Sequence, residues 1–151
     1  MPDSGNKEDL PEVVMPKDRP VKRLKGQKAL VTGGSSGIGR GIAVELGKAG
    51  ADVCINFISK EEKAKEVAEE IESHGSRAVL HRADVSNEDQ VLEMFGHIKD
   101  EFGTLDILVN NAGIQKDAPL EEMTLDDWNK VLDVNLTGQF LCAREAVKEF
   151  K

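Results

Sequence analysis

The sequence predicts an α/β protein built on a doubly wound parallel sheet. Short apolar stretches that suit buried strands alternate with longer segments whose apolar residues recur at helical spacing. No hairpin turn separates one strand from the next, so each connection is a crossover and helices are expected on both faces of the sheet. A glycine-rich turn between the first strand and the first helix marks the edge at which a ligand would bind.

The first strand is predicted at residues 28–32, and the glycine-rich turn follows it. The turn reads Thr-Gly-Gly-Ser-Ser-Gly-Ile-Gly over residues 32–39. Gly33, Gly37 and Gly39 let the backbone turn tightly and approach a ligand, while the helix N-terminus presents free N–H groups. The turn therefore predicts a phosphate site, in which a side chain at Gly37 or Gly39 would take the space of a pyrophosphate. Taken alone, it would also suit a flexible loop or a helix cap.

The first helix is predicted to end at Gly50, which is well placed for a left-handed C-cap. Its buried face is expected to consist of Ile38, Ile42, Val44 and Leu46. The second strand is predicted at residues 52–57.

The second helix is predicted to begin with a capping box, Ser59 with Glu62 three residues later, and to end at Gly75. Its buried positions repeat at i, i+3, i+4 and i+7, and they are Ala64, Val67, Ala68 and Ile71. The third strand is predicted at residues 77–82.

The third helix is predicted to run from an N-cap at Ser86, with Asp89 three residues on, to Gly103. Its buried face is expected to consist of Val91, Phe95, Ile98 and Phe102. The fourth strand is predicted at residues 105–109. In the usual strand order 3-2-1-4, strands one and four border the crevice where the order reverses.

A last helical region is predicted at residues 125–150, where Thr124 and Asp127 form a capping pair. Its interior Gly138 predicts either a kink or a close packing contact. Residues 1–26, by contrast, hold four prolines among charges and predict a flexible tail, or alternatively an arm that packs on a neighbouring subunit. Residues 27–151 are expected to form the folded domain.

The composition narrows the classes of function. With 28 acidic and 20 basic residues the formal net charge is −8, which disfavours a nucleic-acid partner. We expect no membrane partner and a cytoplasmic location, because no apolar run is long enough to span a bilayer and the start does not resemble a signal peptide. Cys54 and Cys142 are expected to be buried thiols. His74, His81 and His97 are scattered without metal-binding spacing, so no metal site is expected.

Ligands of parallel sheets bind beyond the carboxyl ends of the strands, so the residues there are the candidate binding residues. They are Gly33, Ser35, Ser36, Gly37, Ile38 and Gly39 after the first strand, Phe57, Ile58 and Ser59 after the second, Asp84 and Val85 after the third, and Asn110, Asn111, Ala112 and Gly113 after the fourth.

The spacing of the turn glycines, G-x-x-x-G-x-G, departs from the general dinucleotide fingerprint G-x-G-x-x-G. It resembles the coenzyme motif Thr-Gly-x-x-x-Gly-x-Gly of the short-chain dehydrogenases/reductases. Two further segments resemble this family, Asn-Asn-Ala-Gly at residues 110–113 and Val-Asn-Leu-Thr-Gly at residues 134–138. The resemblance extends from about residue 24 to the end. It implies a Rossmann-like fold, an NADP or NAD cofactor, and hydride transfer with a small-molecule alcohol or carbonyl substrate.

The resemblance also implies roles for individual residues. Asp84 would accept a hydrogen bond from the adenine amino group, and residues 110–113 would lie against the adenosine ribose and tie strand four to its neighbours. Asn135 would be the catalytic asparagine that holds a water in a proton relay. Without the resemblance, Asp84 would be a helix cap and Asn135 a mid-helix residue bonded to its own backbone. The resemblance further implies a homo-oligomer, a dimer or tetramer at full length.

Coenzyme choice depends on the end of the second strand. An acid about 20 residues past the glycine turn would bond the ribose 2′-hydroxyl of NAD and repel the 2′-phosphate of NADP. Asn56, Phe57, Ile58 and Ser59 stand there instead, with Lys60 as the nearest cation. The sequence therefore predicts that NADP is tolerated or preferred.

Within the family, four segments most resemble the bacterial glucose 1-dehydrogenases, at residues 59–62, 127–131, 135–138 and 144–146. 3-Oxoacyl-carrier-protein reductases and other sugar or polyol dehydrogenases are the alternatives. The family's catalytic Ser and Tyr-x-x-x-Lys pair would fall after Phe150, and the chain contains no Tyr. We therefore expect the N-terminal half of an enzyme, inactive by itself. The alternative of another class is a non-catalytic dinucleotide-binding module.

Overall fold

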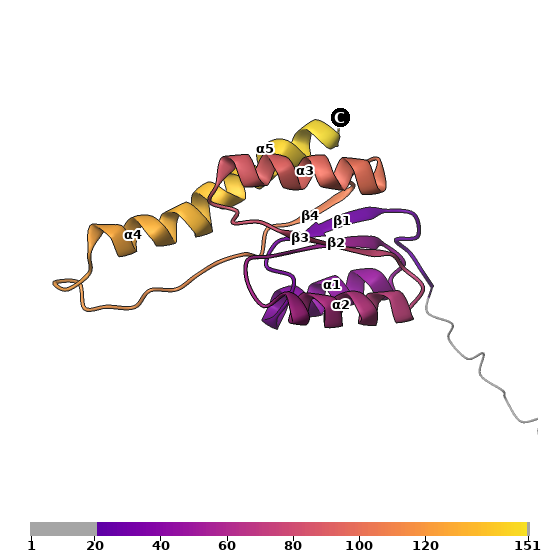
Figure 1. Cartoon of the computed structure of the whole chain (residues 1–151), viewed down its shortest axis with the longest axis horizontal. Coiled ribbons are helices and arrows are strands. Elements are labelled where there is room, and N and C mark those ends of the chain that lie inside the picture. Colours follow the sequence, from indigo (N-terminus) through magenta and orange to yellow (C-terminus); the bar gives the residue numbers. More distant parts are fainter. Residues whose placement is uncertain (1–20, 151) are drawn as a thin grey trace, which may run out of the picture.

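The computed structural model describes residues 21–150 and shows a four-stranded parallel sheet between two layers of helices (Figure 1). The strands are β1 (Lys28–Val31), β2 (Asp52–Phe57), β3 (Ala78–Arg82) and β4 (Ile107–Val109). Their order is β3-β2-β1-β4, and each neighbouring pair is parallel. The predicted doubly wound fold and strand order are therefore confirmed. Most of the predicted tail lies outside the described residues.

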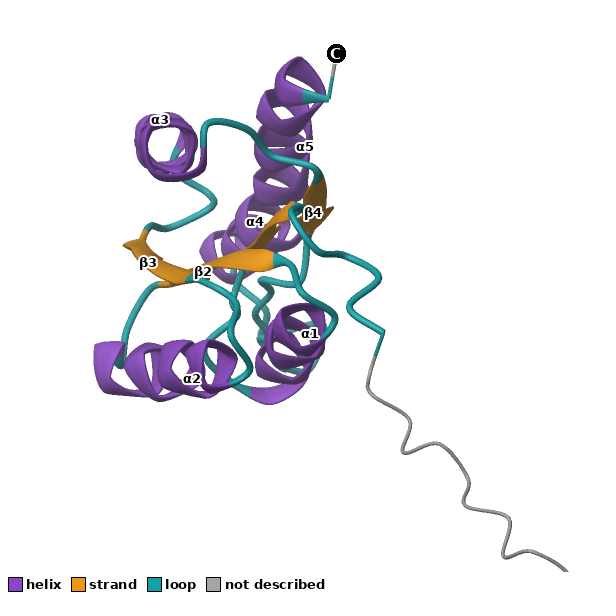
Figure 2. Cartoon of the chain, turned by 90° about the vertical axis from the view of Figure 1, so that its right-hand side faces the viewer, coloured by secondary structure: helices purple, strands orange, loops and turns teal. Residues whose placement is uncertain are grey.

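Helices cover both faces of the sheet, as Figure 2 shows. One layer consists of α1 (Gly37–Lys48) and α2 (Glu61–Ser73), and the other of α3 (Glu88–Phe102) and α5 (Gly138–Glu149). Helix α4 (Leu125–Leu132) extends beyond the sheet and is joined to α5 by a single π-helical segment, η1 (Asp133–Thr137). The predicted last helical region is thus three segments, because a π turn interrupts its regular hydrogen bonding. In residues 21–150 no helix is long and apolar enough to cross a membrane.

The strands alternate their side chains between two hydrophobic clusters, one on each face. Ala29, Val31 and Ile55 face the α1 and α2 layer. Leu30 and Cys54 face the α3 and α5 layer, where they meet residues such as Met94 and Leu141. The buried faces predicted for α2 and α3 are confirmed except that Ala68 and Phe102 are only partly buried, and Met94 is buried in addition. Burial raises the pKa of the Cys54 thiol to about 12 and that of Cys142 to about 11, so both are packed thiols as expected.

The predicted buried face of α1 is wrong in part. Ile38 is 78% exposed, whereas the buried positions of this helix are Gly39, Ala43, Val44 and Gly47. A Cβ atom on Gly47 would lie 2.8 Å from the Cγ2 of Ile71. Small residues therefore let α1 approach α2 closely, while Ile42 and Leu46 are partly buried against the same cluster.

Two of the three predicted N-caps are wrong. Lys60, in the left-handed region with φ 61°, occupies the N-cap of α2, and no side chain caps that end. Asn87 caps α3 by accepting a bond from the N–H of Gln90, while Ser86 bonds to Asp84. The third prediction is confirmed, because the Thr124 side chain accepts a bond from the N–H of Asp127. Gly50, Gly75 and Gly103 have left-handed φ values after their helices, as predicted for the C-terminal glycines.

At the amino ends of the strands, a set of polar bonds ties three strands together. The Asp52 carboxylate accepts bonds from the Nζ of Lys28 on β1 and from the backbone N–H of Arg77, just before β3. Burial alone would raise the pKa of Asp52, but these two bonds and the two nearby positive charges outweigh it and hold the pKa below its usual value. The pairing of β1, β2 and β3 thus depends in part on an ionised carboxylate.

Candidate functional site

The carboxyl ends of all four strands open onto one pocket of about 610 Å³. This volume lies within the roughly 300–1,000 Å³ common for small-molecule sites. The predicted binding residues that line it are Gly33, Ser35, Ser36, Gly37, Ile38, Gly39, Phe57, Ile58, Ser59, Asp84, Val85, Asn111, Ala112 and Gly113. Asn110 lies outside the lining, and its side chain donates to the carbonyl of Gln139 at the start of α5.

The glycine turn depends on the missing side chains at two of its positions. Gly37 has φ +54°, and a Cβ atom there would meet no atom within 4 Å, so the space in front of the turn is open. Gly39 differs, because its Cβ atom would overlap the carbonyl oxygen of Gly33 and the side-chain amide of Asn111. Our expectation that a side chain at Gly39 would fill the ligand space is therefore wrong. It would instead force the turn away from β4.

Thr32 and Asn111 join the turn after β1 to the turn after β4. The Thr32 hydroxyl oxygen accepts bonds from the backbone N–H groups of Asn111 and Ala112, both at 3.0 Å. The Asn111 side chain donates to the carbonyls of Thr32 and Gly33, at 3.0 and 3.2 Å. These bonds fix the positions of two loops that face the pocket from neighbouring strands.

Asn56 performs the same task on the other side of β1. It is 2% exposed, its Oδ1 accepts a bond from the N–H of Gly33 at 3.2 Å, and its Nδ2 donates to the carbonyl of Ala83 at 2.9 Å. From the sequence, Asn56 is predicted only as a neighbour of the coenzyme ribose. The available signal for its bridging role is a polar residue in a strand whose neighbours are apolar, since a buried amide needs hydrogen-bond partners.

Asp84 lines the pocket, and one of its carboxylate oxygens is hydrogen-bonded within the protein. Its Oδ1 accepts bonds from the backbone N–H and the hydroxyl of Ser86, at 3.0 and 2.7 Å. The two bonds close a turn before α3 and orient the side chain.

Asn135 lies in η1, and both ends of its amide bond to the backbone of Ile114. Its Oδ1 accepts from the N–H of Ile114 and its Nδ2 donates to the carbonyl of the same residue, both at 2.8 Å. The side chain thus holds the segment after β4 against η1, and the neighbouring Val134 and Ile114 line the pocket. π-Helical turns of this kind recur at functional sites.

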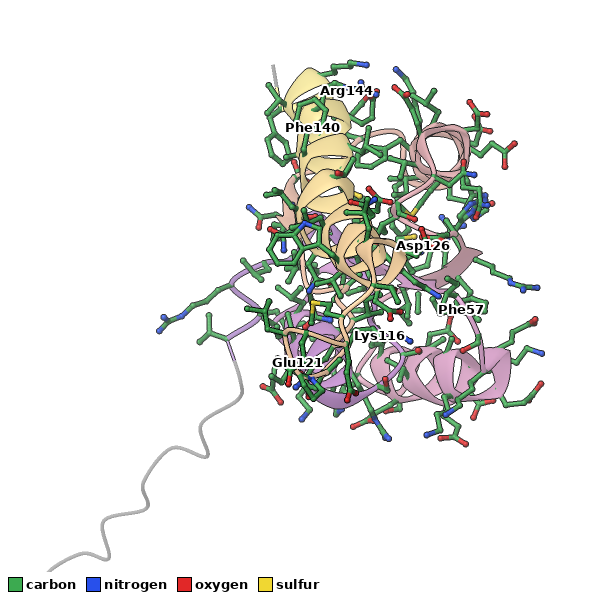
Figure 3. All side chains as sticks on the ribbon, turned by 90° about the vertical axis from the view of Figure 1, so that its left-hand side faces the viewer. Phe57, Lys116, Glu121, Asp126, Phe140 and Arg144 are labelled. Atoms are coloured by element: carbon green, nitrogen blue, oxygen red, sulfur yellow. The ribbon has the colours of Figure 1, made fainter. Side chains whose placement is uncertain are left out.

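The charge at the pocket comes mainly from the start of α2. Lys60 and Lys63 both line the pocket, and within residues 21–150 neither forms an ion pair. Asp84 supplies the one acidic side chain among the lining residues. Lys63 was missed from the sequence because it lies in the first turn of α2, after the residues that directly follow β2. Figure 3 looks onto this end of the molecule, where Phe57 lies near α2 and Lys116 lies on the loop before α4.

A parallel sheet with this strand order and a glycine turn beside its central crevice places the chain in the class of doubly wound α/β proteins. A family model described as short chain dehydrogenase matches residues 27–151. The chain belongs to the short chain dehydrogenase family.

Solved structures agree with this assignment. A short chain dehydrogenase from Burkholderia cenocepacia in complex with NADP is 42% identical and superposes with a TM-score of 0.82, over 84% of this chain and 52% of that one. A dehydrogenase/reductase from Sinorhizobium meliloti is 41% identical with a TM-score of 0.82, over 86% and 52%. A mutant of a Serratia marcescens short-chain dehydrogenase/reductase is 33% identical with a TM-score of 0.83, over 85% and 53%. The chain spans about half the length of these structures.

Proposed function

We propose that the protein is an NAD(P)-dependent oxidoreductase and that the described pocket holds its coenzyme. The observation that carries this proposal is the convergence of the glycine turn with the ends of β2, β3 and β4 on one pocket. The NADP in the Burkholderia cenocepacia structure and the family membership support it. When bound, NAD(P) supplies or accepts the hydride.

The residues present fit such a coenzyme. The open space in front of Gly37, next to the N-terminus of α1, suits a pyrophosphate. Asp84 offers a carboxylate for the adenine amino group. After β4, the small residues Ala112 and Gly113, together with Asn111, leave room for the adenosine ribose. Lys60, Lys63 and Ser59 would face a 2′-phosphate, which supports use of NADP.

For the chemistry, we propose that Asn135 positions η1 and does not itself bind the water of the proton relay. Its side-chain amide is bonded to Ile114, so a relay water would use other groups of η1, such as its backbone carbonyls. The proton-exchanging Tyr of the family has no counterpart among these 151 residues. We accordingly propose that this chain binds coenzyme and that turnover requires the family's Tyr-x-x-x-Lys segment.

The substrate that we propose is a small alcohol or carbonyl compound, with glucose as the first candidate. 3-Oxoacyl-carrier-protein reductase activity and other sugar or polyol dehydrogenase activities are the alternatives. A cytoplasmic location and assembly as a dimer or tetramer belong to the same proposal. A non-catalytic coenzyme-binding module is the second candidate function, and the same pocket would serve it.

The test is a titration of NADPH and NADH fluorescence with the wild-type chain and a Gly37→Val variant. We expect saturable binding by the wild type and its loss in the variant, because the side chain would enter the open space and the left-handed φ disfavours it. Gly41→Val is the matched control, since Gly41 lies on α1, is exposed and has free space around its Cβ position. Unchanged affinity in folded Gly37→Val would contradict the proposed site.

A further inference from the structure

Two histidines that lie far apart in the sequence meet on the surface of the fold. His81 on β3 and His97 on α3 have ring centroids 5.0 Å apart, with the ring planes inclined by 36°. Both side chains are partly exposed, and neither lines the pocket described above. Our expectation that the histidines are scattered is therefore wrong for this pair. Helical periodicity brings His97 onto the face of α3 that packs over β3.

The spacing of the two rings suits a shared metal ion. Zinc binds imidazole nitrogen at about 2.0–2.1 Å, which places the centroids of two imidazoles about 5 Å apart at a tetrahedral angle. The outer torsion of a histidine side chain is soft. Rotation about this torsion redirects the ring nitrogens without moving the backbones of β3 and α3.

The surroundings favour a cation once the rings are neutral. Burial and the neighbouring His97 lower the pKa of His81, while the carboxylate of Glu93 acts in the opposite direction. Glu93 lies one turn before His97 on α3, so its negative charge is close to both rings. From β2, the residue paired with His81 is the uncharged Asn56. Each neutral imidazole offers a lone pair, and the negative charge of Glu93 lies close by.

We propose that His81 and His97 form a two-histidine site for a late divalent transition-metal ion such as Ni²⁺, Cu²⁺ or Zn²⁺. Imidazole suits these ions, and water completes the coordination. Residues 21–150 contain no group of three or more metal-ligating side chains, so the site is a two-ligand chelate of moderate affinity. Because it joins the edge strand β3 to α3, the bound ion stabilises the folded state. This inference is independent of the proposed coenzyme site.

The test uses untagged protein, so that His74, His81 and His97 are the only histidines present. We expect the Tm to rise saturably with added NiCl₂ or ZnCl₂ at pH 7.5. The rise should disappear at pH 5, where protonated imidazoles cannot bind metal. MgCl₂ should leave the Tm unchanged, because Mg²⁺ prefers oxygen ligands.

His81→Gln and His97→Gln should each lose most of the Ni²⁺-dependent rise, while His74→Gln should keep it. His74 is the matched control because it lies at the C-terminal end of α2 and bonds Lys22 through its backbone carbonyl. NMR of the wild type provides a readout that needs no variant, since bound Cu²⁺ should broaden the ring signals of His81 and His97 before those of His74. A Tm that does not respond to Ni²⁺ or Zn²⁺, a rise that persists in His81→Gln, or equal broadening of all three histidines would overturn the proposal.

Discussion

Three asparagine side chains set the shape of the pocket. Asn56, Asn111 and Asn135 each use the side-chain amide on backbone groups of another segment. An amide carries a donor and an acceptor, so one residue can bridge two loops that lie on different strands. The pocket is thus held by side-chain to backbone bonds that act before any ligand arrives.

Gly39→Ala should destabilise the protein more than Gly37→Ala. The added methyl group at residue 39 would overlap Gly33 and Asn111, so the turn must shift at a cost of about 1–3 kcal/mol, as for other overpacked sites. At residue 37 the cost is the left-handed backbone, about 1 kcal/mol. Urea unfolding of both variants measures the difference, with Gly41→Ala as the control. Equal stability of the two variants would show that the turn is looser than the structure indicates.

Removal of both pocket lysines should weaken NADP binding and spare NAD. A Lys60→Ala, Lys63→Ala double variant loses the cations that would face a 2′-phosphate, so we expect roughly a tenfold increase in the Kd for NADP. Lys65→Ala is the control, because Lys65 lies on the same helix but pairs with Glu61 at 3.0 Å. Fluorescence titrations supply the constants. A wild-type Kd for NAD at least tenfold lower than that for NADP would refute the proposed coenzyme preference.

The protein should lose stability as Asp52, which joins the amino ends of β1, β2 and β3, is protonated. A carboxyl whose pKa is lowered by folding adds stability above its unfolded-state pKa of about 3.9, and this contribution is lost as pH falls through the lower folded-state pKa. We expect Asp52→Asn to cost about 1–2 kcal/mol at pH 7, because two bonds from charged or backbone donors are weakened. The difference from wild type should shrink as pH falls below about 3.9 toward the lower folded-state pKa.

Urea unfolding at a series of pH values measures this effect. Asp100→Asn is the control, because Asp100 lies exposed on α3. A cost for Asp52→Asn that stays constant from pH 7 to pH 2 would mean that the carboxylate charge has no part in joining the strands.

The order of helices and strands was predicted well from the sequence, whereas the N-caps of the helices were predicted less well. Apolar periodicity located β1 to β4 and α1 to α3 because burial on a covered sheet leaves a strong pattern. The caps of α2 and α3 failed because neighbouring residues compete for the same position. Ser86 was a suitable cap by type, but Asp84 binds its hydroxyl and leaves the cap to Asn87. The π-helical η1 was not predicted, because apolar periodicity does not distinguish one π turn from the α-helix around it.

The part of the site that lies directly after the strands was predicted from the sequence. The glycine turn and the segments after β2, β3 and β4 do line one pocket, because parallel strands bring their carboxyl ends to one edge. Lys63 and Val134 were missed because helices deliver them to the pocket from outside that edge. The His81 and His97 pair was missed for a similar reason, since the contact depends on how α3 lies across β3.

The chain should associate with a second copy of itself. β4 is an edge of the four-stranded sheet, and open strand edges favour pairing with another chain. The outer side of α4, η1 and α5 also exposes a row of large apolar side chains, which are Leu125, Trp128, Leu132, Leu136, Phe140 and Val147. Figure 3 shows Phe140 and Arg144 together on α5. Large apolar side chains exposed along neighbouring helical segments commonly mark an interface.

Sedimentation or light scattering tests this prediction. We expect Phe140→Lys to lower the apparent mass, because a charge is placed in the middle of the apolar row. Leu92→Lys is the control, since Leu92 is exposed on α3 outside this row. A monomeric wild-type chain at micromolar concentration would refute self-association.

Turnover should require more than these 151 residues. The chain has no Tyr to exchange a proton with the substrate oxygen, so we expect it to reduce no NAD(P) in the presence of glucose. A longer chain that continues through a Tyr-x-x-x-Lys segment should do so. Both proteins are assayed side by side at equal concentration against a blank without enzyme. Activity of the shorter chain above that blank would show that its catalytic residues lie elsewhere.

The position of β1 in the sheet has a consequence for folding during translation. β1 is translated first among the strands, yet it pairs with β2 on one side and with β4 on the other. β4 leaves the ribosome about 80 residues later, which at about 5–20 residues per second takes roughly 4–16 s. Until then β1, one of the two inner strands of the four-stranded sheet, has one open side in the nascent chain. That interval is when a ribosome-associated chaperone would have most to protect.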